Sequence, residues 1–533
     1  MIIRREDLDP AILADLEKNR IDTDLSLKLL NGWNSGKYKD VRPVTVREIP
    51  GPDGKTIIDM PRLEEFRIPA GKALKNLRIL LPDADPADFC REEGQDLIFS
   101  RQNLETLGVL LYPYLSYGVL NGGSATSYGD TKKNRGMSEE LYRLLEPAFL
   151  RSAELCRDRP KGITPAYSNP DGSPGRSFLE LKMRNLLLEA LRYRRAAGKH
   201  LPKKSVLRDA LPGPLAPMFQ MTSIFTDRAV SEAFGEYRDS PLLASLSAEL
   251  GIDITLVETG VQPLISAFSH SDEGPVKKIF TRAGGTEGET LGLPGGHGQN
   301  FLILRDVYRR LRAGGKRFVY LGNVDNIGFT PDPAALAVLA LSGRQAGFEF
   351  SFKTGVDVKG GILVVDDRGR LTCADIGPAV SPEEVRKAEG AGKRVLFNVA
   401  TGLFDLDHLV RNLDGIIAGL PTRWSDQDKD AGKYSQAEQV TWEVIGVLDD
   451  IVIFGVDKYR RFLAAKLLIE GLLTGGAGLD NPAFPADPDP DKDLKRLGTK
   501  LYEGFRWNME NRYGMILING RWEPAPFTAG MEN

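Results

Sequence analysis

Several short runs of β-branched and aromatic residues each lead into a glycine-containing turn and then into a helix-like segment. The clearest runs are Tyr114–Leu120, Met218–Thr222, Ile252–Val257, Arg317–Leu321 and Ile451–Phe454. Between them, apolar residues recur at helical spacing, as in Leu179 to Ala190 and Leu304 to Leu311. This order is typical of parallel strands joined by crossover helices. The sequence therefore predicts an α/β fold with a mostly parallel sheet flanked by helices.

The two ends of the chain differ from this pattern. Residues 1–104 are richer in charge and proline, with helical stretches near Pro10–Asn19 and Leu25–Asn31, so we expect an N-terminal lobe. The α/β core should occupy residues 105–475. After it comes GGAGLDNPAFPADPDPDKD, whose glycines and prolines interrupt both helix and strand. Residues 476–533 are therefore expected to form a linker and a C-terminal tail.

Charge and composition limit the partners of the chain. It has 70 lysines and arginines against 73 aspartates and glutamates, so no overall positive field favours nucleic acid or an acidic membrane. The most apolar long run, residues 107–120, contains Pro113 and is shorter than the ~20 residues that span a bilayer. The three cysteines show neither metal-site nor disulfide spacing. We expect a soluble, cytoplasmic protein without nucleic-acid or membrane partners, and the sequence leaves its oligomeric state open.

The first motif with chemical meaning is LNGGSATSYG, residues 120–129, which follows an apolar run. Adjacent glycines at the end of a strand let the backbone turn and approach a ligand, and free N–H groups there can bind phosphate or base oxygens. An isolated Gly-Gly pair is more often a tight turn with no other role. Taken alone, the motif permits a nucleotide site without requiring one.

The second motif is PGGHG, residues 294–298, which leads directly into an amphipathic segment. Free amides and the dipole of the following helix would face an anion, and His297 could add a hydrogen bond to a phosphate. A helix cap with a histidine facing solvent is an equally good interpretation of the same residues.

The third motif is LGNVDNIG, residues 321–328, after the apolar run RFVY. A carboxylate at the carboxyl end of a buried strand lies where open α/β sheets bind ligands, and an aspartate oxygen suits Mg²⁺. Asp325 is thus the candidate metal ligand, with Asn323 beside it. A turn rich in Asn and Asp is the alternative.

Three further segments place a lysine near glycines or at a strand end. They are PKG at 160–162, DVKGG at 357–361 and VDKYRRFLAAK at 456–466. Lysine is a mobile point charge suited to triphosphate oxygens, although any single lysine is usually just exposed to solvent. Several anion-binding elements together with one metal carboxylate favour a nucleoside triphosphate site. No GxGxxG fingerprint with a downstream ribose-binding acid supports a dinucleotide-dependent dehydrogenase.

The motifs together resemble those of the eukaryotic-type UDP-sugar pyrophosphorylases, a family that includes UDP-glucose and UDP-N-acetylglucosamine pyrophosphorylases. LNGGSATSYG looks like the family's LNGGLGTxMG loop. PKGI, FQMTS, PGGHG, NVDN, DVKGG, Phe397-Asn398 and VDKYRRFLAAK follow in the family's order. The resemblance spans residues 114 to 470. It implies a Rossmann-like mixed sheet of the nucleotide-diphospho-sugar transferase type, with UTP and a sugar 1-phosphate as substrates and Mg²⁺ as cofactor.

The resemblance also implies roles for single residues. Those near the nucleotide would be Leu120, Gly122, Gly123, Met221, Gly296, His297 and Asn323. Those near the sugar would be Lys359, Gly360, Asn398 and Thr401. Lys161 and Lys466 would contact phosphates as catalytic residues, and Asp325 would hold Mg²⁺.

Some positions depart from the family. Ser124 and Ala125 replace a Leu-Gly pair in the glycine loop, and residues 130–160 separate that loop from Lys161, which makes Lys132 and Lys133 rivals for its role. Counting back from Pro263, the family's uracil-binding glutamine falls near Thr259, with Gln262 close but shifted.

Three functions remain open from the sequence. UDP-glucose formation is favoured by the histidine of PGGHG, and UDP-N-acetylhexosamine formation by PKGI and MTS. A homologue that binds UDP-sugars without catalysis would explain Ser124 and Ala125.

Overall fold

A computed structural model describes residues 2–38, 44–123, 128–157, 159–208, 217–354, 357–429, 431–489 and 493–526. Within these ranges the largest sheet has 11 strands, of which eight follow one path in the order β2-β19-β13-β16-β12-β6-β7-β8. Along the path, the strands are Ile57–Asp59, Ile451–Val456, Ala346–Phe352, Leu396–Asp405, Phe318–Asn323, Leu115–Leu120, Met218–Ser223 and Glu258–Gln262. β14 (Gly361–Asp366) pairs with β16 at the side of this path and carries β1 (Val46–Glu48) and β15 (Leu371–Asp375).

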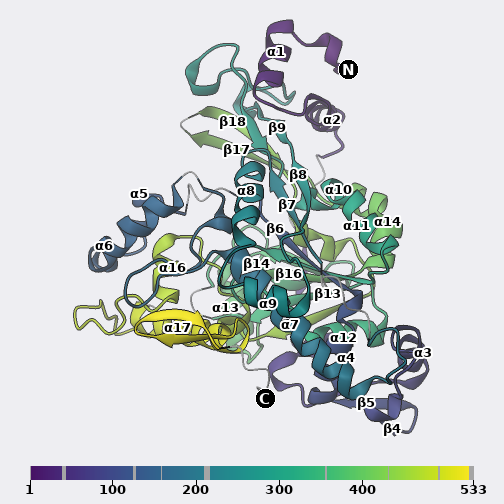
Figure 1. The fold of residues 1–533 in the computed structure, drawn as a ribbon. Coiled ribbons are helices and arrows are strands. Elements are labelled where there is room, and N and C mark those ends of the chain that lie inside the picture. The colour runs from purple at the N-terminus through teal and green to yellow at the C-terminus, as the bar shows by residue number, and fades with distance from the viewer. Residues whose placement is uncertain are drawn as a thin grey trace.

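The strand directions confirm the predicted mixed, mostly parallel sheet. β16 pairs antiparallel with both of its neighbours on the path, β12 and β13. The other five pairs on the path are parallel. Parallel neighbours need crossover connections, which explains why helices cover this sheet on both faces (Figure 1).

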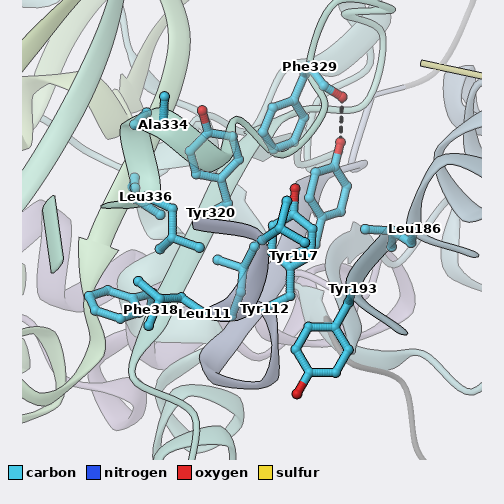
Figure 2. Packing of buried hydrophobic residues seen from close by; sticks show 14 of the residues in the cluster. Leu111, Tyr112, Tyr117, Leu186, Tyr193, Phe318, Tyr320, Phe329, Ala334 and Leu336 are labelled. Atoms are coloured by element: carbon cyan, nitrogen blue, oxygen red, sulfur yellow. Dashed lines mark hydrogen bonds between the residues drawn. The ribbon is translucent and has the colours of Figure 1, made fainter. Parts of the chain in front are cut away.

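Side chains on β12 show how the two faces of the sheet are filled. Phe318 and Tyr320 belong to one hydrophobic core, and Val319 and Leu321 to the other, as the two-residue period of a strand requires. Figure 2 shows part of the first core, with Tyr117 and Phe329 beside Tyr320. The helices of this face include α3 (Ala70–Leu80), α4 (Arg101–Leu110), α7 (Phe178–His200) and α12 (Pro333–Ser342). The opposite face carries α10 (Asn300–Ile303), α11 (Arg305–Ala313) and α14 (Leu406–Gly419).

Most of the elements expected from sequence are present. The predicted helices near residues 10–19, 25–31, 179–190 and 304–311 correspond to α1 (Pro10–Lys18), α2 (Thr23–Asn34), α7 and α11. The strand predicted at Ile252–Val257 is wrong. α9 (Ala244–Leu250) ends at a left-handed Gly251, and Asp253 then accepts a hydrogen bond from the N–H of Thr255, which forms a turn. Buried Ile252 and Ile254 made this loop look like a strand, and β8 begins only at Glu258.

Smaller elements surround the sheet. They are the sheet β3-β5-β4 (Glu65–Pro69, Asp96–Ser100, Arg91–Glu93), β9 (Leu264–Ser266) with β11 (Gly292–Pro294), and β10 (Phe268–Ser269) with β18 (Gly432–Glu438) and β17 (Arg423–Lys429). Other α-helices are α5 (Thr131–Arg135), α6 (Glu139–Cys156), α8 (Asp227–Tyr237), α13 (Pro382–Gly390), α15 (Lys458–Arg461) and α16 (Leu468–Thr474). The C-terminal segment, defined here as residues 493–526, forms α17 (Leu494–Asn511) and the hairpin β20-β21 (Met515–Ile518, Arg521–Pro524). In Figure 1 it lies in yellow beside α16.

The domain boundaries at residues 104 and 475 stay predictions. β1 and β2, from the expected N-terminal lobe, pair with strands of the main sheet. Of the helices that the structure describes, none combines the length and apolar character needed to cross a bilayer.

Candidate active site

The predicted nucleotide-binding residues meet where four neighbouring strands end. β12, β6, β7 and β8 are parallel, so their carboxyl ends lie along one edge of the sheet. Asn323 on β12 is in register with Leu120 on β6, which is in register with Met221 on β7. Such an edge is where open α/β sheets bind ligands. Residues that are far apart in sequence therefore share one site.

An ion pair between Lys161 and Asp325 stands at this edge. Lys161 Nζ lies 2.6 Å from Asp325 Oδ2 and 2.6 Å from the carbonyl oxygen of Ala465. The lysine and aspartate side chains are 13% and 20% exposed, so water screens the pair only in part. Lys161 Nζ also lies 4.6 Å from the centre of the Tyr128 ring, within the range of a cation–π contact. Two of the three predicted catalytic residues are thus in direct contact.

Backbone contacts explain how Lys161 reaches the glycine loop despite the intervening residues 130–160. Its N–H donates a hydrogen bond of 3.1 Å to the carbonyl of Gly123. The next residue, Gly162, packs so closely that a Cβ there would lie 2.3 Å from Asn121 Oδ1. The rivals Lys132 and Lys133 lie on α5 with exposed side chains. Of these three lysines, Lys161 is the one that contacts Asp325.

Lys466 follows directly after the residue whose carbonyl binds Lys161. Its backbone N–H donates to Glu470 Oε2 at 2.7 Å at the start of α16, and its side chain is exposed. The backbone of Lys466 thus lies beside the carbonyl that binds Lys161, and its ammonium faces solvent. The phosphate contact of Lys466 stays a prediction.

The glycine turn is described as far as Gly123, and Ser124 and Ala125 lie outside the described residues. The carbonyl of Gly122 accepts a hydrogen bond from Ser223 Oγ at 3.0 Å. A Cβ on Gly122 would lie 3.4 Å from Gln262 Oε1, so the loop passes against this glutamine. Gly122 therefore sits where β6, β7 and β8 end together.

Gln262 lies in the site, although the family pattern placed the uracil-binding glutamine near Thr259. Its Nε2 donates to the carbonyl of Gly296 and to Gln299 Oε1, both at 2.8 Å. It therefore binds the second glycine motif at Gly296 and lies beside the first at Gly122. Thr259, where the family count pointed, instead accepts a hydrogen bond from Gln220. A glutamine that ends a strand immediately before Pro263 was the available signal.

The second glycine motif packs tightly against the chain near residue 439. Gly296 has φ +80°, and a Cβ there would lie 2.4 Å from the carbonyl oxygen of Gln439. The N–H of Gly298 donates to that same carbonyl at 2.8 Å. Only glycine allows both the left-handed conformation and the close approach. The motif thus has a structural reason for its glycines, in addition to its proposed role near uracil.

His297 is held in one tautomer by its neighbour Thr441. The N–H of Thr441 donates to His297 Nδ1 at 3.1 Å, so in the neutral ring the proton is on Nε2. Burial lowers the pKa of His297 to about 4. A neutral imidazole with Nε2–H is a hydrogen-bond donor, which is what contact with a phosphate oxygen requires. The predicted phosphate contact itself stays a prediction.

The lowered pKa of His297 predicts a change in stability with pH. Because the folded pKa, about 4, is below the ordinary 6.5, the unfolded chain binds the proton first, and stability falls as pH drops between these values. Replacing His297 by asparagine keeps an acceptor for Thr441 and removes the titrating group. We expect the free energy of unfolding, measured with urea, to fall more steeply with decreasing pH in the wild type than in the variant. The difference in slope between pH 6.5 and 4 should be up to ~1.4 kcal/mol per pH unit. Equal slopes would contradict the assignment.

The predicted sugar residues lie on or near β14 and β16. Gly360, with φ +125°, packs against the ring of Phe397, where a Cβ would lie 2.7 Å away. Asn398 Oδ1 accepts a hydrogen bond from the N–H of Ala400 at 2.9 Å. Thr401 is buried in β16, in register with Gly322, and Lys359 is exposed. Their roles toward a sugar stay predictions.

An acidic residue also faces this region. A Cβ on Gly361 would lie 3.6 Å from Asp375 Oδ1 and 3.8 Å from the Asn398 Cβ. Asp375 Oδ2 is paired with Arg423 at 2.9 Å, and Arg423 is also paired with Glu443 at 2.7 Å. Asp375 is thus oriented next to Asn398 by an arginine that the sequence motifs had not indicated.

The donor set around Asp325 fits Mg²⁺ bound together with a triphosphate. Among the described residues there is no group of three or more His, Cys, Asp or Glu side chains that could hold a metal alone. Mg²⁺ typically uses one or two carboxylates, with phosphate and water oxygens completing its shell. Asp325 supplies one partly exposed carboxylate, and Lys161 engages its Oδ2. Asp325 is therefore a suitable protein ligand for Mg²⁺ that arrives with a nucleotide.

Comparisons with known proteins show what part of this sequence resembles. Residues 271–470 match the family model of UTP–glucose-1-phosphate uridylyltransferase. The uridylyltransferase of Solanum tuberosum is 27% identical over 221 residues, 39% of this chain and 46% of that protein, and that of Hordeum vulgare is 27% identical over 220 residues with the same shares covered. The match thus spans less than half the length of these relatives.

Solved structures extend the likeness to the fold. UDP-glucose phosphorylase of Trypanosoma brucei has a TM-score of 0.52 at 16% identity, over 91% of this chain and 81% of that one. A point mutant of UDP-glucose pyrophosphorylase from Leishmania major has a TM-score of 0.51 at 15% identity, over 91% and 80%. Residues 271–470 are thus similar in sequence to the UTP–glucose-1-phosphate uridylyltransferases, and the overall fold is similar to that of a UDP-glucose phosphorylase.

Proposed function

We propose that the protein is a nucleotidyltransferase that forms a UDP-sugar and pyrophosphate from UTP and a hexose 1-phosphate, with Mg²⁺ as cofactor. The observation that carries this proposal is the Lys161–Asp325 pair, which lies against the glycine loop at the carboxyl end of the sheet. Glucose 1-phosphate is the proposed sugar substrate, because residues 271–470 match UTP–glucose-1-phosphate uridylyltransferases.

In the proposed reaction, a phosphate oxygen of the sugar 1-phosphate attacks the α-phosphorus of UTP. The bond from that phosphorus to the bridging oxygen breaks, and pyrophosphate leaves with the electron pair. A phosphate monoester is largely dianionic at neutral pH, because its second pKa is about 6, so the nucleophile needs no general base. The work left to the protein is to align two anions and neutralise their charge.

The residues of the site divide this work. Gly122, Gly123, Met221 and Gly296 are proposed to surround uracil. Gln262, which binds Gly296 and lies beside Gly122, is added to them. His297 would donate from Nε2 to the α-phosphate. Lys161 and Lys466 would contact phosphate oxygens, and Gly360 and Asn398 would lie near the sugar. Asp325 would hold Mg²⁺, which when bound supplies positive charge to the triphosphate.

Charge within the site supports this assignment. An ammonium and a carboxylate in contact neutralise each other, so neither carries an unpaired charge before UTP arrives. A triphosphate with Mg²⁺ offers each partner a new counter-charge. Lys161 can therefore turn toward phosphate while Asp325 turns toward the metal, at little electrostatic cost.

The direct test is release of pyrophosphate by the purified protein from UTP, Mg²⁺ and a panel of sugar 1-phosphates. Glucose 1-phosphate is expected to give the highest kcat/KM. A higher value with N-acetylglucosamine 1-phosphate would favour the alternative product, which PKGI and MTS suggest. Binding of UDP-glucose without pyrophosphate release from any sugar would instead show a homologue without catalysis.

We also propose a reducing, cytoplasmic setting. Cys90, Cys156 and Cys373 are all free thiols in the structure. Burial raises the pKa of Cys156 to about 11 and that of Cys373 to about 12, which keeps both as inert thiols.

A further inference from the structure

The turn that carries Asp325 is followed by a loop, residues 326–329, whose carbonyl groups are bound by buried side chains. Tyr117 on β6 donates from its hydroxyl to the carbonyl of Phe329 at 2.7 Å (Figure 2). Lys182 on α7 donates from Nζ to the carbonyls of Asn326 and Phe329, at 2.7 and 3.0 Å. Tyr513 donates to the carbonyl of Ile327 at 2.5 Å. Three separate parts of the chain thus fix this loop.

Tyr513 comes from the C-terminal segment, far in sequence from the site. Its side chain is fully buried, and its position is set from α7, where Arg184 donates to the carbonyls of Tyr513 and Gly514 and Asn185 donates to that of Arg512. The tyrosine therefore has little freedom to move away from Ile327.

The C-terminal segment also packs against residues 458–466, the stretch that leads to Lys466. Asn508 on α17 donates to the carbonyl of Arg460 at 3.0 Å, and a Cβ on Gly504 would lie 1.8 Å from the carbonyl oxygen of Tyr459. Both contacts fall on α15, which leads to Ala465 and Lys466. The C-terminal segment thus packs against the chain on both sides of the catalytic ion pair.

Asn326 joins the loop 326–329 to residues 461–463, next to the turn that carries Asp325. Its Nδ2 donates to the carbonyl of Arg461, and its Oδ1 accepts hydrogen bonds from the N–H groups of Leu463 and Gly328. Any shift of the 326–329 loop would therefore move Asp325 and the carbonyl of Ala465, both of which bind Lys161. This coupling makes the supports of the loop relevant to catalysis.

We propose that Tyr513 is a positioning residue, through which the C-terminal segment fixes the turn that presents Asp325 to Mg²⁺ and UTP. The inference rests on the proposed function. Its physical basis is that small misplacements of groups at a reacting centre are costly: a shift of about 1 Å can lower a rate about a hundredfold. Tyr513 itself touches neither substrate nor metal, and acts through Ile327.

The test compares two buried tyrosines whose hydroxyls each donate to a backbone carbonyl. Tyr193 donates to Leu207 and is as buried as Tyr513, but it points away from the Tyr117–Phe329 pair (Figure 2). Tyr513→Phe and Tyr193→Phe each remove one oxygen and should lower the melting temperature similarly. Tyr513→Phe alone should lower kcat about tenfold while leaving KM for glucose 1-phosphate within about twofold.

Binding supplies a readout that does not depend on activity. Calorimetry of UTP binding should show that Mg²⁺ strengthens binding less in Tyr513→Phe than in the wild type or in Tyr193→Phe. Binding of UTP without Mg²⁺ should be the same in all three proteins. If Tyr513→Phe does not fold, Tyr117→Phe applies the same change to the same loop from β6 and should give the same pattern.

The outcomes separate the two proposals. Equal kcat and equal effects of Mg²⁺ on UTP binding for Tyr513→Phe and Tyr193→Phe would overturn the positioning role, even if the wild type is active. No pyrophosphate release by the wild type would overturn the proposed function. In that case the calorimetric comparison would still decide whether Tyr513 positions the metal-binding turn.

Discussion

Replacing Asp325 by asparagine is expected to lower turnover several hundredfold, on the order of the 10²–10³ lost with one electrostatic group at a transition state. Asparagine keeps the size of the side chain and an oxygen, but it removes the negative charge. It also leaves the ammonium of Lys161, 2.6 Å from Oδ2, without its counter-charge. Mg²⁺ would then lose the negatively charged ligand that the protein supplies. The measurement is pyrophosphate release at saturating UTP and sugar 1-phosphate.

A matched control separates this loss from general damage. Lys353 and Glu389 form another lysine–carboxylate pair, 2.9 Å apart, in which the lysine is 10% exposed, close to the exposure of Lys161. Glu389→Gln makes the same chemical change on α13 and is expected to keep nearly full turnover. High Mg²⁺ should recover part of the activity of Asp325→Asn, because the lost group acts through the metal. Comparable turnover of the two variants would rule out the role given to Asp325.

Lys161→Met is expected to cause a loss of similar size, about a hundredfold or more in kcat. Methionine keeps the length and apolar stem of lysine, so the packing against the Tyr128 ring should survive. The ammonium that would neutralise phosphate oxygens is removed, and Asp325 loses its partner. Affinity for UTP measured by calorimetry should fall as well, because Lys161 would contact the triphosphate before and during the reaction.

Lys132→Met provides the comparison for Lys161. Lys132 was a rival in sequence, because it follows the glycine loop closely, yet its exposed side chain lies on α5. Its loss should change kcat less than about threefold, the range of a solvated surface charge. A larger loss with Lys132→Met than with Lys161→Met would transfer the catalytic role to α5.

Local sequence patterns were sufficient to predict four strands of the main sheet, β6, β7, β12 and β19. Each of these strands is an apolar run bounded by turns, so the residues of the run alone indicate a strand. The run at Ile252–Val257 failed because burial alone does not distinguish a strand from a loop that packs its isoleucines into the core. Gly251 and Asp253 carried the turn signal, and they outweighed the β-branched residues.

The site was predictable only where a motif carried the information. Asp325 follows a strand, and the residues around it indicate its role. For Gln262 the sequence offered only its position before Pro263, and the end of β8 beside Gly122 places it in the site. Tyr513 and Lys182 could not be found from sequence at all. Each looks like an ordinary residue of its own segment, and only the fold brings it to the loop after Asp325.

The hydrogen bond between the N–H of Lys161 and the carbonyl of Gly123 has a consequence for how such proteins can diverge. This bond joins the two ends of the segment that connects the glycine loop to Lys161. The segment therefore begins and ends at the same place in the site. A chain excursion closed at its base can gain or lose residues at little entropic cost to the rest of the molecule. Relatives could therefore exchange whole excursions at this base, altering α5 and α6 while the lysine stays in place.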